Sequence, residues 1–411
     1  NGRAQGVETL TLEDCLRVGI DNNLSLESKR REIQKSKYGV SENRARLLPQ
    51  ISAVAGYSNN FDPPVSVTDG SSYGVPYNIT QTLQHSANAG LEMQMPLFNQ
   101  TLYTSMSIAK VVEEISRLSY GKAREDIILQ ISKMYYLGQV TAEQIVLIKA
   151  NITRLEELRD ITRAFFDNGM SMEVDLKRVN INLENLKVQY DNAQAMMKQQ
   201  LNMLKYIMDY PAEKEIALTP VNTDSITTVA LTGLSENLYE LQLTQSQLEL
   251  AERQKRMITN GYIPSLSLTG NWRYAAYTDK GYHWFHSGPS NHWFRSYGLG
   301  LTLRIPIFDG LDKTYKIRKA MIDIENRKLA WEDTRKNLQT QYLNAVNDLM
   351  NNQRNFKKQK DNYLLAEDVY AVTSDRYREG IASMTEVLQD EMQMSEAQNN
   401  YINAHYNYRV T

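Results

Sequence analysis

The 411-residue sequence contains no apolar run that approaches the roughly 18 residues of a membrane-spanning helix, and its mean hydropathy is −0.51. Both features exclude a helical membrane protein. The net charge is only −2, so no basic excess points to a nucleic-acid partner. The single cysteine, Cys15, cannot form an internal disulfide, and we expect it to be a small buried apolar side chain.

Catalytic constellations are also missing. We find no nucleophile paired with a base, no phosphate-binding loop and no metal triad, so an enzyme is not expected. Three histidines share one aromatic loop, but their spacing matches no standard site, and we expect neither metal nor cofactor. They are His283, His286 and His292. The chain starts at Asn1 rather than Met, which fits removal of a signal peptide.

What the sequence does contain is a strict alternation between Tyr297 and Asp309. The apolar positions are Tyr297, Leu299, Leu301, Leu303, Ile305 and Ile307, and between them lie Gly298, Gly300, Thr302, Arg304 and Pro306. A period of two predicts a β-strand with one apolar and one polar face. A tilted strand of about ten residues is long enough to cross a bilayer.

Three other stretches alternate in the same way, although the first of them is weaker. We therefore predict four amphipathic strands, at about residues 50–61, 85–98, 264–277 and 296–308. The segment from Asp62 to Gln84 is rich in Pro, Gly, Ser and Asp, and is predicted to be a long exposed loop.

Helical patterns fill most of the remaining chain. Between Asn99 and Phe166 there is no proline, and apolar residues recur at alternating steps of four and three, which is a heptad seam. We predict a long helix over 99–167, a turn at Gly169 in the left-handed C-cap position, and a return helix over 171–210. A further helical segment is expected from about 11 to 48.

The same order of elements then recurs 211 residues later, where Gly380 corresponds to Gly169. This internal duplication is the strongest signal in the sequence. The first repeat is 1–210, and 211–232 is a connector or equatorial region. The second repeat is 233–411, with a long helix over 309–379 and a return helix over 382–410.

Four strands per chain cannot close a barrel, and open strand edges are not tolerated in lipid, so several chains must share one barrel. Three chains would give twelve strands and an open lumen. Polar side chains would then line water; they are Glu92, Gln94, Arg273 and Arg304. Aromatic residues crowd one end of the second strand pair, as in an interfacial girdle. They are Trp272, Tyr274, Tyr277, Trp284, Trp293 and Phe294.

These motifs together resemble the TolC family of outer-membrane efflux and secretion ducts. The resemblance rests on the duplicated layout, on P-Q-I-S and P-S-L-S before the first strand of each repeat, and on M-P-L-F-N and I-P-I-F-D where each second strand passes into a helix. It implies a fold that is mainly α with membrane β: a long antiparallel α-helical barrel continuous with a β-barrel shared by a homotrimer. It also implies the outer membrane of a Gram-negative bacterium, with the helices extending into the periplasm.

The resemblance further implies a passive exit duct of a tripartite efflux pump or type I secretion system, served by a periplasmic adaptor and, through it, an inner-membrane pump. Asp175, Tyr377 and Glu386 match positions that gate the inner tip in known members. The tip turns, where the adaptor would contact the duct, comprise Asn168, Gly169, Met170, Glu379, Gly380 and Ile381. This sequence departs from the family pattern at Ala382 and Gln389, where those members carry a gating Arg and a second acid.

Each of these positions also has an explanation without a gate. Tyr377 ends a heptad seam, so packing alone would explain it, and acids in the first turn of a helix are favoured by its dipole. As an alternative for the whole chain, the strands would be ordinary two-faced hairpins in a non-membrane coiled-coil protein. The two hypotheses differ in whether Leu299, Leu301 and Leu303 contact lipid or protein. The transported cargo is not encoded in any motif.

Overall fold

The computed structural model describes residues 8–63, 65–69, 74–81, 83–220, 233, 235, 237–278 and 293–411. The chain divides into two compact units, and each unit takes segments from both sequence repeats. One consists of Asn1–Glu32, Arg117–Leu243 and Glu332–Thr411, and the other of Ile33–Ser116 and Thr244–Trp331. Among the described helices, none has the length and apolar character that a membrane crossing requires.

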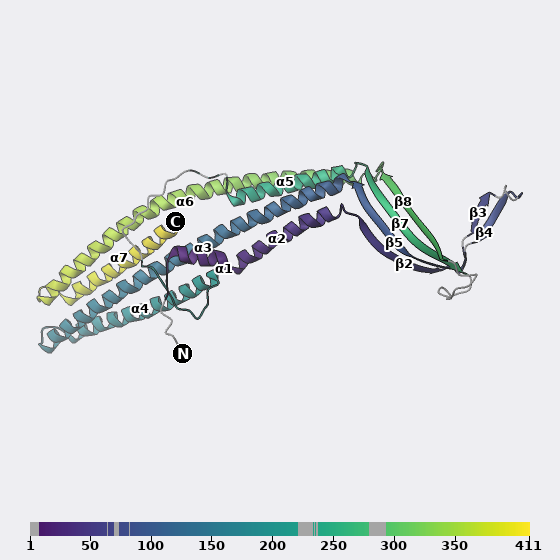
Figure 1. The fold of residues 1–411 in the computed structure, drawn as a ribbon. Helices are drawn as coiled ribbons and strands as arrows, with labels where there is room; N and C mark the ends of the chain where they lie inside the picture. The colour runs from purple at the N-terminus through teal and green to yellow at the C-terminus, as the bar shows by residue number, and fades with distance from the viewer. Residues whose placement is uncertain are drawn as a thin grey trace. The chain divides into compact units, whose positions relative to one another are not determined.

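The second unit contains a four-stranded antiparallel sheet in the order β2 (Gln50–Asn59), β5 (His85–Phe98), β7 (Ser265–Thr278) and β8 (Trp293–Arg304) (Figure 1). The two halves of the sequence meet where β5 pairs with β7. Strand β8 ends at Arg304 rather than near residue 308. Pro306 lies just beyond this end, and proline has no N–H to donate to a ladder.

The segment between β2 and β5 corrects one sequence prediction. It was expected to be a loop, but Val65–Asp69 (β3) and Tyr77–Gln81 (β4) pair as an antiparallel hairpin. Alternating Val65, Val67 and Ile79 are compatible with strands, and the prolines and glycines around them masked this short pattern.

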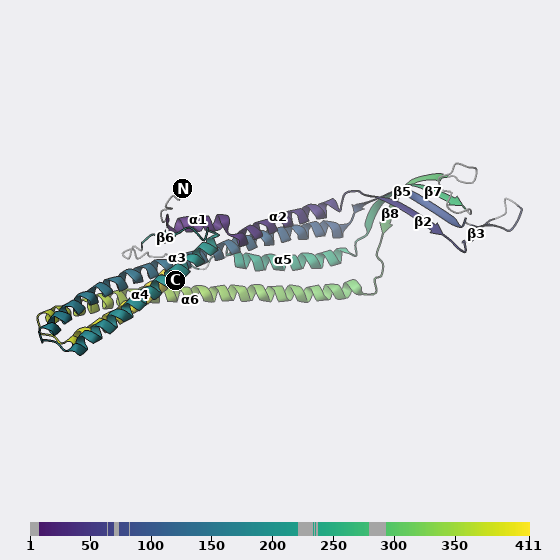
Figure 2. The ribbon, with the colours of Figure 1, turned by 90° about the horizontal axis from the view of Figure 1, so that it is seen from below.

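Two helices, α3 (Gln100–Asp167) and α6 (Asp312–Arg378), dominate the helical part, and each runs as one continuous element (Figures 1 and 2). The return helices are α4 (Glu173–Met208) and α7 (Met384–Val410). The remaining helices are α1 (Leu12–Asn22), α2 (Leu24–Ala45) and α5 (Tyr239–Asn260).

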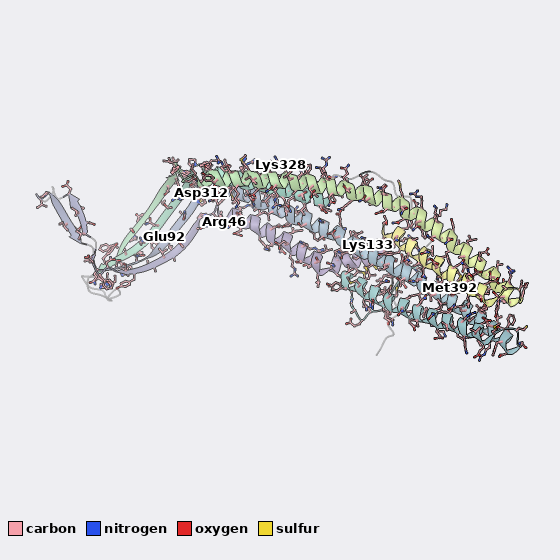
Figure 3. The ribbon with its side chains drawn as sticks, turned by 180° about the vertical axis from the view of Figure 1, so that it is seen from behind. Arg46, Glu92, Lys133, Asp312, Lys328 and Met392 are labelled. Carbon is pink, nitrogen blue, oxygen red and sulfur yellow. The ribbon has the colours of Figure 1, made fainter. Side chains whose placement is uncertain are left out.

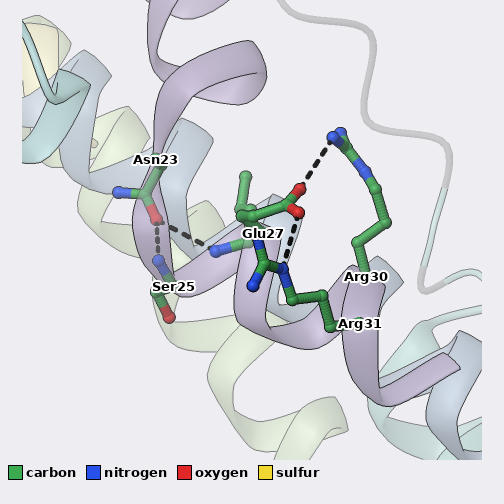
Figure 4. Close-up of polar contacts among 6 residues, drawn as sticks. Asn23, Ser25, Glu27, Arg30 and Arg31 are labelled. Atoms are coloured by element: carbon green, nitrogen blue, oxygen red, sulfur yellow. Dashed lines mark hydrogen bonds and ion pairs between the residues drawn. The ribbon is translucent and has the colours of Figure 1, made fainter. Parts of the chain in front are cut away.

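The helical segment expected from 11 to 48 is in fact two helices, α1 and α2, separated at Asn23 (Figure 4). The Asn23 side chain explains the break, because its Oδ1 accepts hydrogen bonds from the backbone N–H groups of Ser25 (2.9 Å) and Leu26 (3.1 Å) and so caps α2. Its Nδ2 donates to the carbonyl of Ile207 at 2.7 Å. The sequence prediction missed this cap because apolar residues continue across Asn23 in helical register.

A short parallel pair, β1 (Glu8–Leu10) with β6 (Ile216–Leu218), lies in the first unit and was not predicted. The pair packs on a core that includes Cys15, Ile131 and Met208. Cys15 is fully buried, as expected, and burial raises the pKa of its thiol to about 11. Such a thiol is an inert packing group.

The heptad seams form the second core of this unit, which α3, α4, α6 and α7 build together. Its largest members on the two long helices include Leu155, Phe356, Tyr363 and Tyr370. Phe356 stacks on Tyr401 and His405 of α7, with ring centroids 5.9 and 4.8 Å away. The predicted seam therefore holds each return helix against the long helices.

Candidate functional site

The two turns that join each long helix to its return helix have the same backbone geometry. Gly169 and Gly380 adopt φ values of +74° and +76°. The N–H of Gly169 donates to Phe166 and that of Met170 to Phe165; the N–H of Gly380 donates to Tyr377 and that of Ile381 to Arg376. These are two Schellman motifs, in which glycine supplies the left-handed residue at no steric cost.

The return helices begin differently after the two turns. Ser383 caps α7 in a capping box: the backbone N–H of Ser383 donates to Glu386 Oε2 at 2.9 Å, and the N–H of Glu386 donates to Ser383 Oγ at 3.3 Å. Met172 caps α4 with no side-chain hydrogen bond. Asp175 lies in the first turn of α4, with Arg178 at 3.4 Å. Both acids lie near the positive end of a helix dipole.

Tyr377 lies inside the core at the end of α6 rather than on the surface of the chain. Its hydroxyl donates to Thr162 Oγ1 at 3.4 Å, and its ring lies 5.5 Å from that of Phe165. Both partners belong to α3. Packing therefore accounts for Tyr377, and its contacts tie the ends of the two long helices to each other.

Additional polar contacts between α3 and α6 were not found by sequence reasoning. Arg154 pairs with Glu367 at 2.7 Å, and Arg378 pairs with Glu157 at 3.3 Å. The members of each pair are more than two hundred residues apart, so no local motif connects them. The position that departs from the family pattern, Ala382, is half-buried and packs on the core of α3, α4, α6 and α7.

Exposed apolar side chains cluster around the turns. They are Met170, Met172, Val174 and Ile381. Asn168 Nδ2 donates to the carbonyl of Ala164 at 2.7 Å, which orders the first turn. Both turns thus combine a fixed backbone with an apolar exterior, which is typical of contact surfaces.

The sheet separates its side chains by chemistry, as the alternation predicted. The apolar row of β8 is exposed over 60–80% of its area at Tyr297, Leu299, Leu301 and Leu303. On the opposite face, Arg273 Nη2 donates to Glu92 Oε1 at 2.7 Å, and Figure 3 marks Glu92 on the sheet. Trp272 and Tyr274 contact edge to face, with ring centroids 5.4 Å apart. Trp284 and the three loop histidines His283, His286 and His292 lie outside the described residues.

Within the described ranges, no group of three or more His, Cys, Asp or Glu residues is arranged to hold a metal ion. The tip acids Asp175 and Glu386 belong to different return helices. The geometry of the chain therefore offers two capped turns, an apolar tip surface and an amphipathic sheet.

Known proteins that resemble this chain belong to one family. The family described as "Outer membrane efflux protein" matches residues 18–208 and 230–411. The outer membrane protein TolC of Vibrio cholerae is 20% identical over 385 residues, covering 90% of this chain and 81% of that protein. The probable efflux pump outer membrane protein TtgC of Pseudomonas putida is 23% identical over 409 residues, covering 94% of this chain and 78% of that protein.

Among solved structures, CusC is similar with a TM-score of 0.78 at 15% identity, covering 100% of this chain and 92% of that chain. At this identity the likeness is one of fold. All three relatives are named as outer-membrane or channel proteins, and none as an enzyme. The chain therefore belongs to the outer membrane efflux protein family and acts as an exit channel for efflux across the Gram-negative outer membrane.

Proposed function

We propose that three copies of this chain join their sheets into one twelve-stranded barrel, which forms the membrane part of the duct. The observation that carries the proposal is the sheet itself: it has four strands, and β2 and β8 are its outer strands. An outer strand presents a row of backbone N–H and C=O groups along its edge, and such an edge is stable in lipid only when another strand covers it.

The two faces of the sheet support this arrangement. Outward-facing Leu299, Leu301 and Leu303 provide the apolar band that lipid requires. Inward-facing Glu92 and Arg273 form an ion pair that suits a water-filled lumen. The long helices α3 and α6 with their return helices would continue the duct as an α-helical barrel in the periplasm.

In this arrangement the protein is a passive conduit of a tripartite pump. Its relatives include proteins named as efflux pump outer membrane components, which supports a role beside an energised inner-membrane partner and a periplasmic adaptor. The adaptor would contact the tip turns, where Met170 and Ile381 are exposed next to the fixed glycine turns. Type I secretion is a second use of the same duct.

We assign the aperture to the same tip. Threefold symmetry would bring three copies of Asp175 and of Glu386 around one axis, where like charges repel and attract cations. Tyr377 would act from the core, because its hydrogen bond to Thr162 holds α6 against α3. Opening the aperture would require these helix ends to move apart.

The oligomer is tested by native mass spectrometry of detergent-extracted protein together with conductance in planar bilayers. We expect a mass of three chains and discrete conductance steps. A stable single chain without detergent, and without conductance, would instead support the non-membrane coiled-coil alternative. In that case Leu299 and its neighbours would be buried by protein rather than by lipid.

A further inference from the structure

A polar groove of about 410 Å³ lies between the two return helices α4 and α7. Among the described residues that line it, five carry amides, one carries a hydroxyl and two carry carboxylates. The hydroxyl is that of Ser395, and the carboxylates are those of the buried Glu391 and the exposed Glu396; the amides include Asn182, Asn185, Gln189 and Asn399. No Lys, Arg or His is among the described residues that line this groove. Figure 3 marks the position of the groove on α7 by Met392, which also lines it.

Glu391 is the unusual member of this groove. It is only 6% exposed, and burial raises the pKa of its carboxyl. Within the described part of the chain, no hydrogen bond or ion pair satisfies it. A buried carboxylate without a partner is costly, so such a group calls for a ligand, a water molecule or a proton.

Other buried polar groups in the same core do have partners. Gln398 accepts a hydrogen bond from Asn151 at 2.6 Å. Glu143 accepts from Tyr401 at 2.7 Å and lies 2.8 Å from His405. These buried neighbours on α3 and α7 therefore each have at least one polar partner, in contrast to Glu391.

We propose that Glu391 is the central ligand of a hard divalent cation of the calcium class, which bridges α4 and α7. Calcium takes six to eight oxygen ligands in flexible geometry and accepts amide carbonyl and hydroxyl oxygens beside carboxylates. Zinc is disfavoured because the groove offers no thiolate or imidazole. With Glu391 as its only buried carboxylate, the site belongs at the weak end of protein calcium sites, with Kd of about 10⁻⁴ to 10⁻³ M.

The direct probe is terbium luminescence excited through tyrosine, because Tyr370 of α6 is buried beside this carboxyl. Burial is the main cause that raises the pKa of Tyr370 to about 12, and the nearby charge of Glu391 is the second cause. We expect saturable terbium luminescence in the full-length protein that added calcium displaces. Absence of binding at millimolar terbium and calcium would overturn the proposal.

Variants make the assignment specific to the groove. Glu391→Gln keeps the shape of the side chain and should weaken binding at least tenfold. Asp390→Asn is the matched control, because it removes the same charge one residue away and outside the lining, and should bind as the natural protein does. Equal affinity in Glu391→Gln and the natural protein, or equal losses in both variants, would contradict the assignment.

A variant that is expected to bind more tightly separates an effect on the site from an effect of misfolding. Asn185→Asp adds a carboxylate from α4 to the two that α7 already contributes, which should tighten calcium binding severalfold. An unfolded protein could not produce this result, and unchanged or weaker binding would count against the site. The readout requires neither a trimer nor conductance, so failure of this proposal would leave the channel proposal intact, and the reverse also holds.

Discussion

His405 Nδ1 lies 2.8 Å from Glu143 Oε2, and this contact joins the last helix, α7, to the long helix α3. Arg409 Nε donates to the other ring nitrogen of His405 at 3.2 Å. Because Nε2 accepts, Nδ1 carries the proton and donates to the carboxylate. His405 is fully buried, so a neutral imidazole between a cation and an anion satisfies all three groups without burying a net charge.

We expect Glu143→Gln to destabilise the protein by about 1–3 kcal/mol at neutral pH, since it breaks a charged hydrogen bond in the core. Burial raises the pKa of Glu143, but hydrogen bonds from His405 and Tyr401 together lower it below its ordinary value. Its contribution is therefore present above the ordinary carboxyl pKa and is lost as the pH falls through the depressed value. Denaturant unfolding at several pH values should show the gap between variant and natural protein closing only in acid. A constant gap would mean that the charge is irrelevant.

Glu391→Gln should stabilise the folded protein, in contrast to Glu143→Gln, when a chelator removes divalent cations. Burial raises the pKa of this carboxyl, so the folded state holds its proton to higher pH than the unfolded state does. Stability of the natural protein is then greatest below the ordinary carboxyl pKa and declines as the pH rises toward the folded value. We expect the variant to be more stable by about 1 kcal/mol or more above that window and equal below it. A variant less stable at every pH would show that the ionised group has a partner.

Substitutions at Gly169 and Gly380 test whether the tip turns need glycine because of their positive φ. Gly169→Ala and Gly380→Ala should each cost about 1 kcal/mol, because an L-residue is strained at their positive φ although nothing lies within 4 Å of the added Cβ. Gly39→Ala is the matched control: Gly39 lies inside helix α2, also with open space, and there the change should stabilise by about 0.5–1 kcal/mol. Thermal melts of the three variants should separate these signs. Equal effects at Gly169 and Gly39 would refute the conformational explanation.

Repetition and alternation made most of the fold predictable. The period of two predicted the four sheet strands, and the heptad seams predicted the two long helices. Glycine at the left-handed C-cap position predicted both turns. The missed elements depend on contacts between distant residues. Strand β1 forms only because Ile216–Leu218 lies beside it, and the break at Asn23 is fixed partly by a hydrogen bond to Ile207. The same applies to Glu391, whose isolation is visible only when α4 and α7 face each other.

The aperture proposal predicts that charge at the tip controls conductance. Glu386→Gln keeps the hydrogen-bond acceptor of the capping box, so a change in conductance or in its block by divalent cations would come from the lost charge. We expect a smaller effect from Asp175→Asn, because Arg178 already lies 3.4 Å from that carboxylate. Glu173→Gln in the same turn of α4, where Lys177 pairs with Glu173 at 2.8 Å, is the control and should conduct normally. Unchanged conductance in all three variants would remove the gate but not the duct.

The strongest test of the barrel compares neighbouring residues on opposite faces of β8. Leu301 pairs with Leu268 on the apolar face and Thr302 with Ser267 on the polar face. In a barrel, Leu301→Arg places a cation in lipid, at a cost of about 2–4 kcal/mol per chain near the middle of the membrane. Thr302→Arg places it in the lumen, where water solvates it. We therefore expect Leu301→Arg to impair trimer assembly in membranes, measured by native mass spectrometry after extraction, while Thr302→Arg assembles and alters only ion selectivity. The reverse pattern would mean that the apolar row faces the pore, and the shared barrel would have to be abandoned.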